Sequence, residues 1–255
     1  MGVREMFELT GKVALITGGS RGLGLQIAAG LAEMGAKIAI SARKSAELEH
    51  AKDELAKLGA EVLTVSNDLA KEGQPAALVE AVAAHFGKLD ILVSNAGASW
   101  GALAEEHTLE AWNKVMNLNA TSVFALSQAA ANRCFIPQGS GNIIVVASTA
   151  ALRAGMQMKA VAYYSSKAAA LHLTRALAVE WGKYNIRVNA ICPGFFPTKM
   201  ADGLLKTIGA DVIARTPLGR LGDESDLQGA AVYLASAASK HVTGQYIAVD
   251  GGASI

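Results

Sequence analysis

Short apolar segments alternate along the chain with longer segments in which apolar and polar positions follow a helical spacing. The short segments are rich in aliphatic and β-branched residues and are bounded by Gly, Asn, Asp or Pro, which is typical of buried strands. We expect strands at Val13–Thr17, Lys37–Ser41, Val62–Ser66, Ile91–Ser94, Ile143–Ala147, Ile186–Ile191 and Tyr246–Val249. The longer segments predict helices at Leu23–Met34, Ala46–Leu58, Pro75–Phe86, Leu109–Arg133, Tyr163–Lys183 and Glu224–Ala235.

This regular alternation predicts an α/β fold in which right-handed crossovers connect parallel strands and helices cover both faces of the sheet. No linker, repeat or low-complexity stretch divides residues 1–255, so we expect one domain. The least regular stretch is Met200–Arg215, which follows Pro193 and Gly194. Its mixed composition predicts a mobile flap at about residues 195–215.

Composition narrows the classes of partner. Hydrophobic residues make up 51% of the chain, and the mean hydropathy is +0.28. No run is long and apolar enough to span a bilayer, so we assign this excess to a large core and to subunit interfaces. The formal charge is +1 without a basic cluster. We therefore expect neither nucleic acid nor a membrane as a partner.

The cysteines and histidines indicate which cellular compartment to expect and whether to expect a metal site. Cys134 and Cys192 are the only cysteines, and two isolated thiols suit a reducing compartment rather than a disulfide framework. The N-terminal residues lack the apolar core of a signal peptide, so we expect a cytoplasmic protein. The five histidines are scattered without metal-ligand spacing, and no metal site is expected.

A glycine-rich turn joins the first predicted strand to the first predicted helix. Gly18, Gly22 and Gly24 follow a G-x-x-x-G-x-G spacing, which differs from the commoner G-x-G-x-x-G dinucleotide motif. In this context, backbone N–H groups and the helix N-terminus can hold a pyrophosphate. The alternative is a turn that only packs the strand against the helix.

The end of the second predicted strand bears on the choice between NAD and NADP. Many NAD-selective proteins carry an acidic residue there, where this chain has Ala42. Arg43 and Lys44 follow it, and Arg21 lies inside the glycine turn. These three cations without a carboxylate suit a 2′-phosphate and predict NADP(H) rather than NAD(H). The alternative is that Arg43 and Lys44 form a solvated helix start.

Tyr163 and Lys167 lie one helical turn apart on the predicted helix that begins at Tyr163. A phenol has a reference pKa of about 10 and exchanges protons poorly at neutral pH. An ammonium on the same helix face favours the phenolate, so we expect Lys167 to lower the pKa of Tyr163. Tyr164 has Ala168 at the corresponding position and is expected to serve in packing.

These motifs occur together in one order and spacing. They are Thr17–Gly24, Ser94-Asn95-Ala96-Gly97, Asn119, Ser148, Tyr163-x-x-x-Lys167, Pro193-Gly194 and Val249-Asp250-Gly251-Gly252. In this respect the chain resembles the short-chain dehydrogenase/reductases over nearly its whole length. The resemblance implies a single Rossmann-type, dinucleotide-binding catalytic domain with a doubly wound, parallel seven-stranded sheet, assembled as a homotetramer.

The resemblance also implies the cofactor contacts. Asp68 and Leu69 are expected at the adenine, Asn95 at a ribose, and Phe196 and Thr198 at the nicotinamide carboxamide. The full expected set is Gly18, Ser20, Arg21, Gly22, Leu23, Gly24, Arg43, Lys44, Asp68, Leu69, Asn95, Ala96, Gly97, Tyr163, Lys167, Pro193, Gly194, Phe196 and Thr198.

Four residues carry the chemistry in such proteins. In the reduction of a ketone, Tyr163 is the expected proton donor, and Ser148 donates a hydrogen bond to the carbonyl oxygen. Lys167 tunes Tyr163 and bonds the nicotinamide ribose, while the Asn119 amide is expected to hold a water that links Lys167 to solvent. Thr149 is a weaker candidate for the hydroxyl role.

The segment between Ser148 and Tyr163 departs from the family pattern. It is about two residues longer than usual, with the extra length somewhere in residues 152–161. Several loops line the expected substrate site and resemble both 3-oxoacyl reductases of the rhamnolipid pathway and gluconate 5-dehydrogenases. The expected substrate residues are Ser148, Trp100, Met156, Met158, Phe195 and Met200, with Phe196 as a further wall.

Met and Phe in loops form adaptable apolar surface, which favours reduction of a 3-oxoacyl thioester by NADPH. The alternative is a sugar-acid or polyol dehydrogenase, and Arg153 or Lys159 could then meet a carboxylate or a phosphate. A third hypothesis is a regulator that senses NADP without turnover, although such relatives typically lose the Tyr or the Lys. The physiological ketone is a small molecule in the first two hypotheses.

Overall fold

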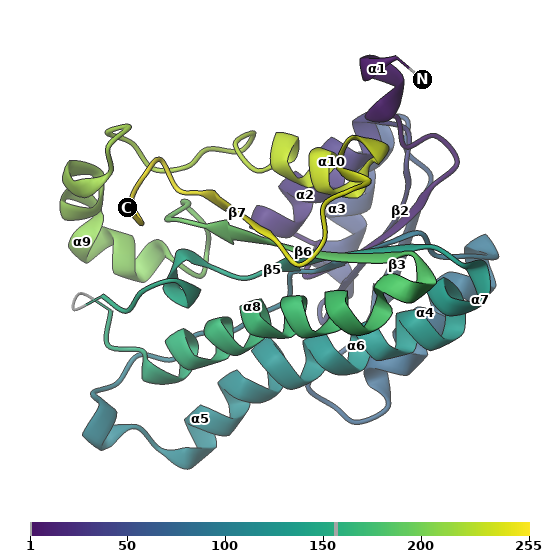
Figure 1. The fold of residues 1–255 in the computed structure, drawn as a ribbon. Coiled ribbons are helices and arrows are strands. Elements are labelled where there is room, and N and C mark those ends of the chain that lie inside the picture. Colours follow the sequence, from purple (N-terminus) through teal and green to yellow (C-terminus); the bar gives the residue numbers. More distant parts are fainter. Residues whose placement is uncertain (1, 156–157) are drawn as a thin grey trace.

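The computed structural model describes residues 2–155 and 158–255 and contains one parallel sheet of seven strands. The strand order is β3-β2-β1-β4-β5-β6-β7 (Figure 1). The strands are β1 Val13–Thr17, β2 Lys37–Ala42, β3 Val62–Ser66, β4 Ile91–Ser94, β5 Gly141–Val146, β6 Ile186–Pro193 and β7 Tyr246–Val249. The predicted doubly wound, seven-stranded parallel sheet is confirmed.

Helices cover both faces of this sheet because the central strands are apolar on both sides, and all five residues of β1 are buried. One core lies under α2 Gly22–Glu33, α3 Ser45–Lys57 and α10 Gln228–Ala235. The other lies under α4 Gln74–Phe86, α6 Ser122–Ala130 and α8 Val161–Trp181. Figure 1 shows these two groups of helices on opposite sides of the sheet.

The order of the strands determines where a ligand site can form. From β1 the chain builds β2 and β3 on one side, and then returns to place β4 on the other side of β1. Ligands of open α/β sheets bind at such a switch point, outside the carboxyl ends of the strands. The carboxyl ends of β6 and β7 point toward α9, Asp202–Arg215, and toward the C-terminus of the chain (Figure 1).

The predicted helix at Leu109–Arg133 is longer and less regular than expected. It comprises α5 Leu109–Met116, a π-turn at Asn117–Thr121, α6, a second π-turn at Ala131–Phe135 and α7 Ile136–Gln138. It ends at Gly139, whose φ of 65° gives the left-handed stop that no earlier residue provides. Hydrophobic spacing does not reveal a π-turn, because one extra residue shifts the pattern only locally.

The stretch expected to form a flap contains a regular helix that the sequence pattern did not predict, and its mobility stays a prediction. Residues 202–215 form the regular helix α9, of which only Val212 is buried. A helix with so few buried positions leaves little amphipathic pattern, and Gly203 and Gly209 interrupt its sequence further. The helix α10 also begins later than the expected Glu224, because the Asp223 carboxylate accepts hydrogen bonds from the N–H groups of Ser225 and Asp226 and forms a turn.

The remaining elements are small: the helix α1 Val3–Met6 near the N-terminus, and short 3₁₀ turns at residues 104–106, 149–151, 182–184 and 237–239. Within the described ranges, no helix has the length and apolar character needed to cross a membrane.

Candidate active site

The glycine turn after β1 has the backbone geometry of a phosphate cradle. Gly18 and Gly22 have φ values of 63° and 55°, which disfavour any other residue. A Cβ on Gly24 would lie 2.4 Å from the Gly18 carbonyl oxygen, so only glycine fits there. The helix α2 begins at Gly22 without a side-chain cap. Its first N–H groups are therefore free to bind an anion, and the turn fits a pyrophosphate.

Asn95 ties this turn to the end of β4. Its Nδ2 donates to the carbonyl oxygens of Thr17 at 2.8 Å and Gly18 at 3.2 Å. In return, Thr17 Oγ1 accepts from the N–H groups of Asn95 and Ala96. The amide of Asn95 thus shapes the turn from behind, a role that its sequence position alone does not reveal.

A carboxylate lies among the predicted phosphate-binding cations, contrary to the sequence-based expectation. Glu47 accepts from Arg21 Nη1 at 2.8 Å and 2.7 Å and from Lys44 Nζ at 3.3 Å. Arg43 is exposed and makes no side-chain hydrogen bond or ion pair within the described part of the chain. Because Glu47 follows Lys44 by three residues at the start of α3, the helical i, i+3 spacing could have indicated this pair.

Ser148 and Tyr163 face one another between the end of β5 and the start of α8. Ser148 caps the 3₁₀ turn at Thr149–Ala151, and its Oγ accepts from the N–H of Ala150 at 3.1 Å. The hydroxyl proton of Ser148 therefore remains available for donation. Burial raises the pKa of Tyr163, although a side-chain hydrogen bond with Ser148 opposes the rise. Tyr163 is therefore a neutral phenol at physiological pH.

The expected effect of Lys167 on Tyr163 is wrong for this structure. Lys167 Nζ lies 5.8 Å from the centre of the Tyr163 ring and donates to the carbonyl oxygen of Val146 at 2.8 Å. Its side chain is buried, and burial lowers the pKa of Lys167 to about 8 despite an opposing contribution from Cys192. Burial therefore affects both groups more than their mutual interaction does.

Asn119 lies in the π-turn and holds the segment after β4 against α8. Its Nδ2 donates to the Ala98 carbonyl at 2.8 Å and to Ser166 Oγ at 2.9 Å, and its Oδ1 accepts from the Ala98 N–H. Both amide donors are thus occupied, which leaves Oδ1 as the only side-chain atom able to bond a water. A Cβ on Gly97 would lie 3.2 Å from Asn119 Oδ1 and 3.7 Å from Lys167 Nζ.

The segment Asn95–Gly97 therefore connects the two halves of the site. Asn95 bonds the glycine turn, and Gly97 lies against Asn119 and Lys167. Thr198 approaches from the other side, with its Cγ2 3.4 Å from where a Cβ on Gly22 would stand. The phosphate cradle and the Tyr163–Lys167 pair are thus parts of one site at the carboxyl end of the sheet.

Not every predicted cofactor residue can use its side chain. Leu69 is buried in one core and Phe196 in the other, so each could contact a cofactor only through its backbone. The Asp68 carboxylate is partly exposed and accepts from the N–H of Ala70 at 3.3 Å. The remaining expected contacts, Ser20, Leu23, Pro193 and Gly194, lie in the glycine turn, at the start of α2 and at the end of β6.

The longer loop before Tyr163 is anchored at three points that the sequence did not reveal. Tyr164 Oη donates to the Gly155 carbonyl and accepts from the Gly155 N–H, both at 3.0 Å. The N–H of Ala102 donates to the Lys159 carbonyl at 2.8 Å, and the Arg153 guanidinium donates to the Ala253 carbonyl in the C-terminal tail. Tyr164, expected to serve only in packing, therefore fixes the loop.

The expected substrate residues differ in how accessible they are. Trp100 is 48% exposed and Met200 57% exposed, whereas Met158 and Phe195 are partly buried. Met156 lies outside the described residues. Lys114 Nζ lies 5.7 Å from the centre of the Trp100 ring, which places a cation beside this part of the rim.

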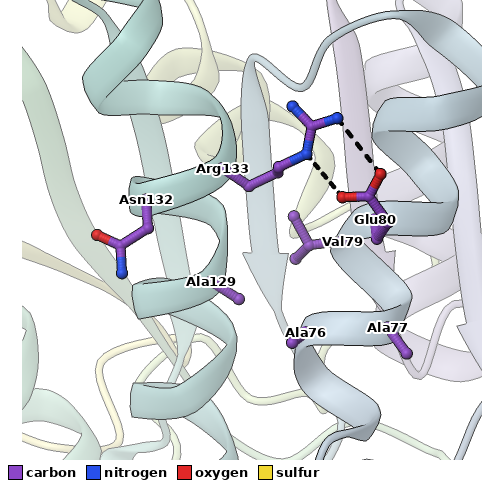
Figure 2. A pocket seen from close by; sticks show the side chains of 7 residues that line it. All are labelled: Ala76, Ala77, Val79, Glu80, Ala129, Asn132 and Arg133. Atoms are coloured by element: carbon purple, nitrogen blue, oxygen red, sulfur yellow. Dashed lines mark hydrogen bonds and ion pairs between the residues drawn. The ribbon is translucent and has the colours of Figure 1, made fainter.

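A hollow of about 500 Å³ lies between α4 and the end of α6 with the π-turn that follows it, and Figure 2 shows the side chains that line it. Three alanines and Val79 line it, and its two charged residues, Glu80 and Arg133, are paired with each other. It offers no unpaired charge and contains none of the predicted site residues. Among the described residues no group of three or more His, Cys, Asp or Glu side chains could hold a metal ion.

Comparisons with known proteins agree with this geometry. Residues 18–254 match the sequence model of a family described as enoyl-(acyl carrier protein) reductase. The 2-dehydro-3-deoxy-D-gluconate 5-dehydrogenase of Dickeya dadantii is 44% identical over 253 residues, which cover 98% of each chain. The rhamnolipids biosynthesis 3-oxoacyl-[acyl-carrier-protein] reductase of Pseudomonas aeruginosa is 38% identical, covering 96% of this chain and 97% of the relative.

A solved structure is also similar over nearly the whole chain. The gluconate 5-dehydrogenase from Burkholderia cenocepacia J2315, in complex with NADP and tartrate, superposes with a TM-score of 0.93 at 35% identity. The match covers 99% of this chain and 98% of that one.

Proposed function

The chain belongs to the short-chain dehydrogenase/reductase family, and from that premise we propose that it interconverts a ketone and an alcohol on a sugar acid with NADP(H). The observation that carries the proposal is that one segment, residues 95–97, connects the phosphate cradle with the Tyr163–Lys167 pair. Asn95 bonds the glycine turn, and Gly97, two residues on, lies against Lys167. A bound dinucleotide would therefore extend from the turn toward Tyr163.

In reduction, NADPH supplies the hydride that adds to the carbonyl carbon of the substrate. Negative charge then develops on the carbonyl oxygen, and Ser148, whose Oγ accepts from Ala150, would stabilise that charge by turning its hydroxyl proton toward the oxygen. Tyr163, a neutral phenol because burial raises its pKa, donates the proton that completes the alcohol. Lys167 uses one N–H on Val146, which leaves two donors for a ribose hydroxyl.

Resupply of the proton must reach Tyr163 from solvent. Both N–H groups of the Asn119 amide already donate hydrogen bonds, so Asn119 could bond a water only as an acceptor, through Oδ1. Oδ1 lies beside Gly97, the residue that also approaches Lys167. We assign Asn119 to this path by its position and by the resemblance, with Lys167 as the next group along it.

The preference for NADP(H) rests on charge. Arg21, Arg43 and Lys44 lie around the end of β2, where Ala42 stands at the position of the usual acid. They outnumber Glu47, and the Arg43 guanidinium has no partner among the described side chains. The Burkholderia cenocepacia enzyme, which is similar over nearly the whole chain, binds NADP.

For the substrate, the relatives favour the sugar-acid alternative over the 3-oxoacyl thioester that the apolar loop residues suggested. The Dickeya dadantii relative is named for a sugar-acid 5-dehydrogenase activity and shares more sequence than the 3-oxoacyl reductase does. The structure adds Arg153, whose guanidinium bonds a backbone carbonyl and no carboxylate among the described residues, so its charge is available for a substrate carboxylate. Exposed Trp100 and Met200 support the 3-oxoacyl thioester as the second candidate.

A substrate panel tests this order. With NADPH, we expect the purified enzyme to reduce 5-ketogluconate with a kcat/KM at least about tenfold above that for acetoacetyl-CoA, because the sugar acid carries a carboxylate that can pair with the Arg153 guanidinium. NADPH fluorescence loss measures both rates, and the Tyr163→Phe variant gives the background. Reduction of acetoacetyl-CoA alone would reverse the order, and binding of NADPH without turnover of any ketone would indicate a cofactor-sensing regulator.

We also propose a homotetramer, and exposed apolar side chains support it. Leu109, Phe124 and Val179 are 78%, 42% and 84% exposed on α5, α6 and α8, which lie on one face of the sheet. Leu218 and Ile255 are exposed near the C-terminal tail. Contacts between copies would remove this surface from water. We expect light scattering to give about four times 26.3 kDa, and a monomeric mass would contradict the proposal.

A further inference from the structure

Glu47 is the single carboxylate within a group of cations that come from three separate segments. Arg21 belongs to the glycine turn, Lys44 precedes α3, and Lys199 follows β6. Partial burial raises the pKa of Glu47, but the hydrogen bond from Lys44 and the charges of Arg21, Lys44 and Lys199 lower it more. Glu47 is therefore fully ionised at neutral pH.

The bonding of Arg21 shows how a phosphate and Glu47 would meet. Only Nη1 of Arg21 contacts Glu47, and it donates to both carboxylate oxygens. Nε and Nη2 make no hydrogen bond within the described residues, so they could receive phosphate oxygens while Glu47 stays in place. A cofactor 2′-phosphate on Arg21 and Lys44 would then lie close to a fixed negative charge.

We propose that Glu47 is a specificity-determining residue that opposes the cofactor 2′-phosphate at Arg21 and Lys44 and so limits the preference for NADPH over NADH. The inference rests on the proposed cofactor. Two like charges that share the same cations repel one another, and the neutral 2′-hydroxyl of NADH does not experience this repulsion. An exposed ion pair contributes little to positioning, and Arg21 and Lys44 are 51% and 68% exposed. Repulsion therefore outweighs any ordering of Arg21 by Glu47.

The test is the replacement Glu47→Gln, which keeps the shape and removes the charge. We expect the Kd for NADPH to fall about 5- to 10-fold at low salt, and the Kd for NADH to change less than about twofold. Fluorescence titration of the free enzyme measures both constants without turnover. The gain should shrink in about 1 M salt, where the screening length is about 3 Å.

Glu54→Gln is the matched control, because it removes the same charge from the same helix at a residue that contacts His50 rather than the cations. It should leave both constants unchanged. Glu47→Ala removes the charge without adding an amide and should shift NADPH binding in the same direction. The Arg43→Ala variant should weaken binding of NADPH and not of NADH, which tests the cofactor assignment independently of Glu47.

The outcomes separate the two proposals. If wild type fails to bind NADPH, or if Arg43→Ala has no effect, the cofactor assignment is wrong. If that assignment holds while both Glu47 variants bind NADPH no more tightly than wild type, Glu47 does not oppose the phosphate. Equal tightening of NADPH and NADH, or weaker binding of NADH alone, would likewise overturn the inference, and the latter would make Glu47 a partner of the ribose hydroxyls.

Discussion

Replacing Tyr163 by phenylalanine should lower kcat/KM for ketone reduction by about 10²- to 10⁴-fold, the range typical of a lost general acid. The phenol is partly buried, its pKa is raised by that burial, and the Ser148 hydroxyl is beside it. The variant removes one oxygen and keeps the ring, so the glycine turn and the Lys167–Val146 hydrogen bond should remain intact. The Kd for NADPH should stay within about twofold of wild type, measured by fluorescence titration.

Tyr164→Phe is the matched control, since it makes the same chemical change at the adjacent residue. It removes the hydroxyl that anchors Gly155, so it should raise KM by loosening the loop before Tyr163 while leaving most of kcat. If Tyr163→Phe keeps more than about a tenth of the wild-type rate, or if both variants lose kcat equally, Tyr163 is not the proton donor.

The sequence was most informative for the strands. Each of the seven predicted strands is present within about two residues of its expected bounds. The central strands are buried on both faces and so are continuously apolar, whereas β3 and β7, which are at most partly buried, are marked by aliphatic and β-branched residues between turn residues. Several motif positions also lie close together in the structure: Asn95 bonds the glycine turn, and Asn119 and Lys167 both lie near Gly97. The phosphate cradle could be predicted because its backbone conformations favour glycine, so the glycines in the sequence mark its position.

The errors have a common physical origin in contacts that local patterns do not encode. The helix α9 was not expected because only Val212 is buried, and the contact between Glu47 and Arg21 was overlooked because the two residues lie 26 positions apart. The pKa of Tyr163 was expected to be lowered by a helical neighbour, yet its burial by the whole fold determines the direction. Spacing identifies adjacent groups, whereas the balance of burial and charge requires the tertiary structure.

Replacing Lys167 by methionine should lower kcat by about a hundredfold or more and also change how stability depends on pH. The side chain is 6% exposed, and burial lowers its pKa from 10.5 to about 8. Between pH 8 and 10.5 the unfolded chain keeps a proton that the folded protein releases, so the free energy of unfolding of wild type rises relative to the variant. The full change is on the order of 3 kcal/mol.

Below pH 8 both states of wild type hold the proton, so the difference between wild type and variant should be constant. Methionine also leaves the Val146 carbonyl without its donor, which adds a cost that does not vary with pH. Burial raises the pKa of Cys192 to about 11, but this thiol is present in both proteins and largely cancels. The slope of the difference, measured by denaturant unfolding from pH 7 to 10.5, is therefore the diagnostic quantity.

Lys183→Met serves as the control, because it removes a lysine from the exposed turn that follows the same helix. The stability of this control variant shows how much of the pH-dependent change arises from replacing any lysine by methionine. The free energy of unfolding of wild type, relative to Lys167→Met, should rise with pH by more than it does relative to the control. That result, together with the loss of turnover, would mean that the buried ammonium is maintained for activity at the expense of stability. A flat difference would mean that the pKa of Lys167 in the folded protein is close to its ordinary value, so that burial does not lower it and the ammonium is well solvated.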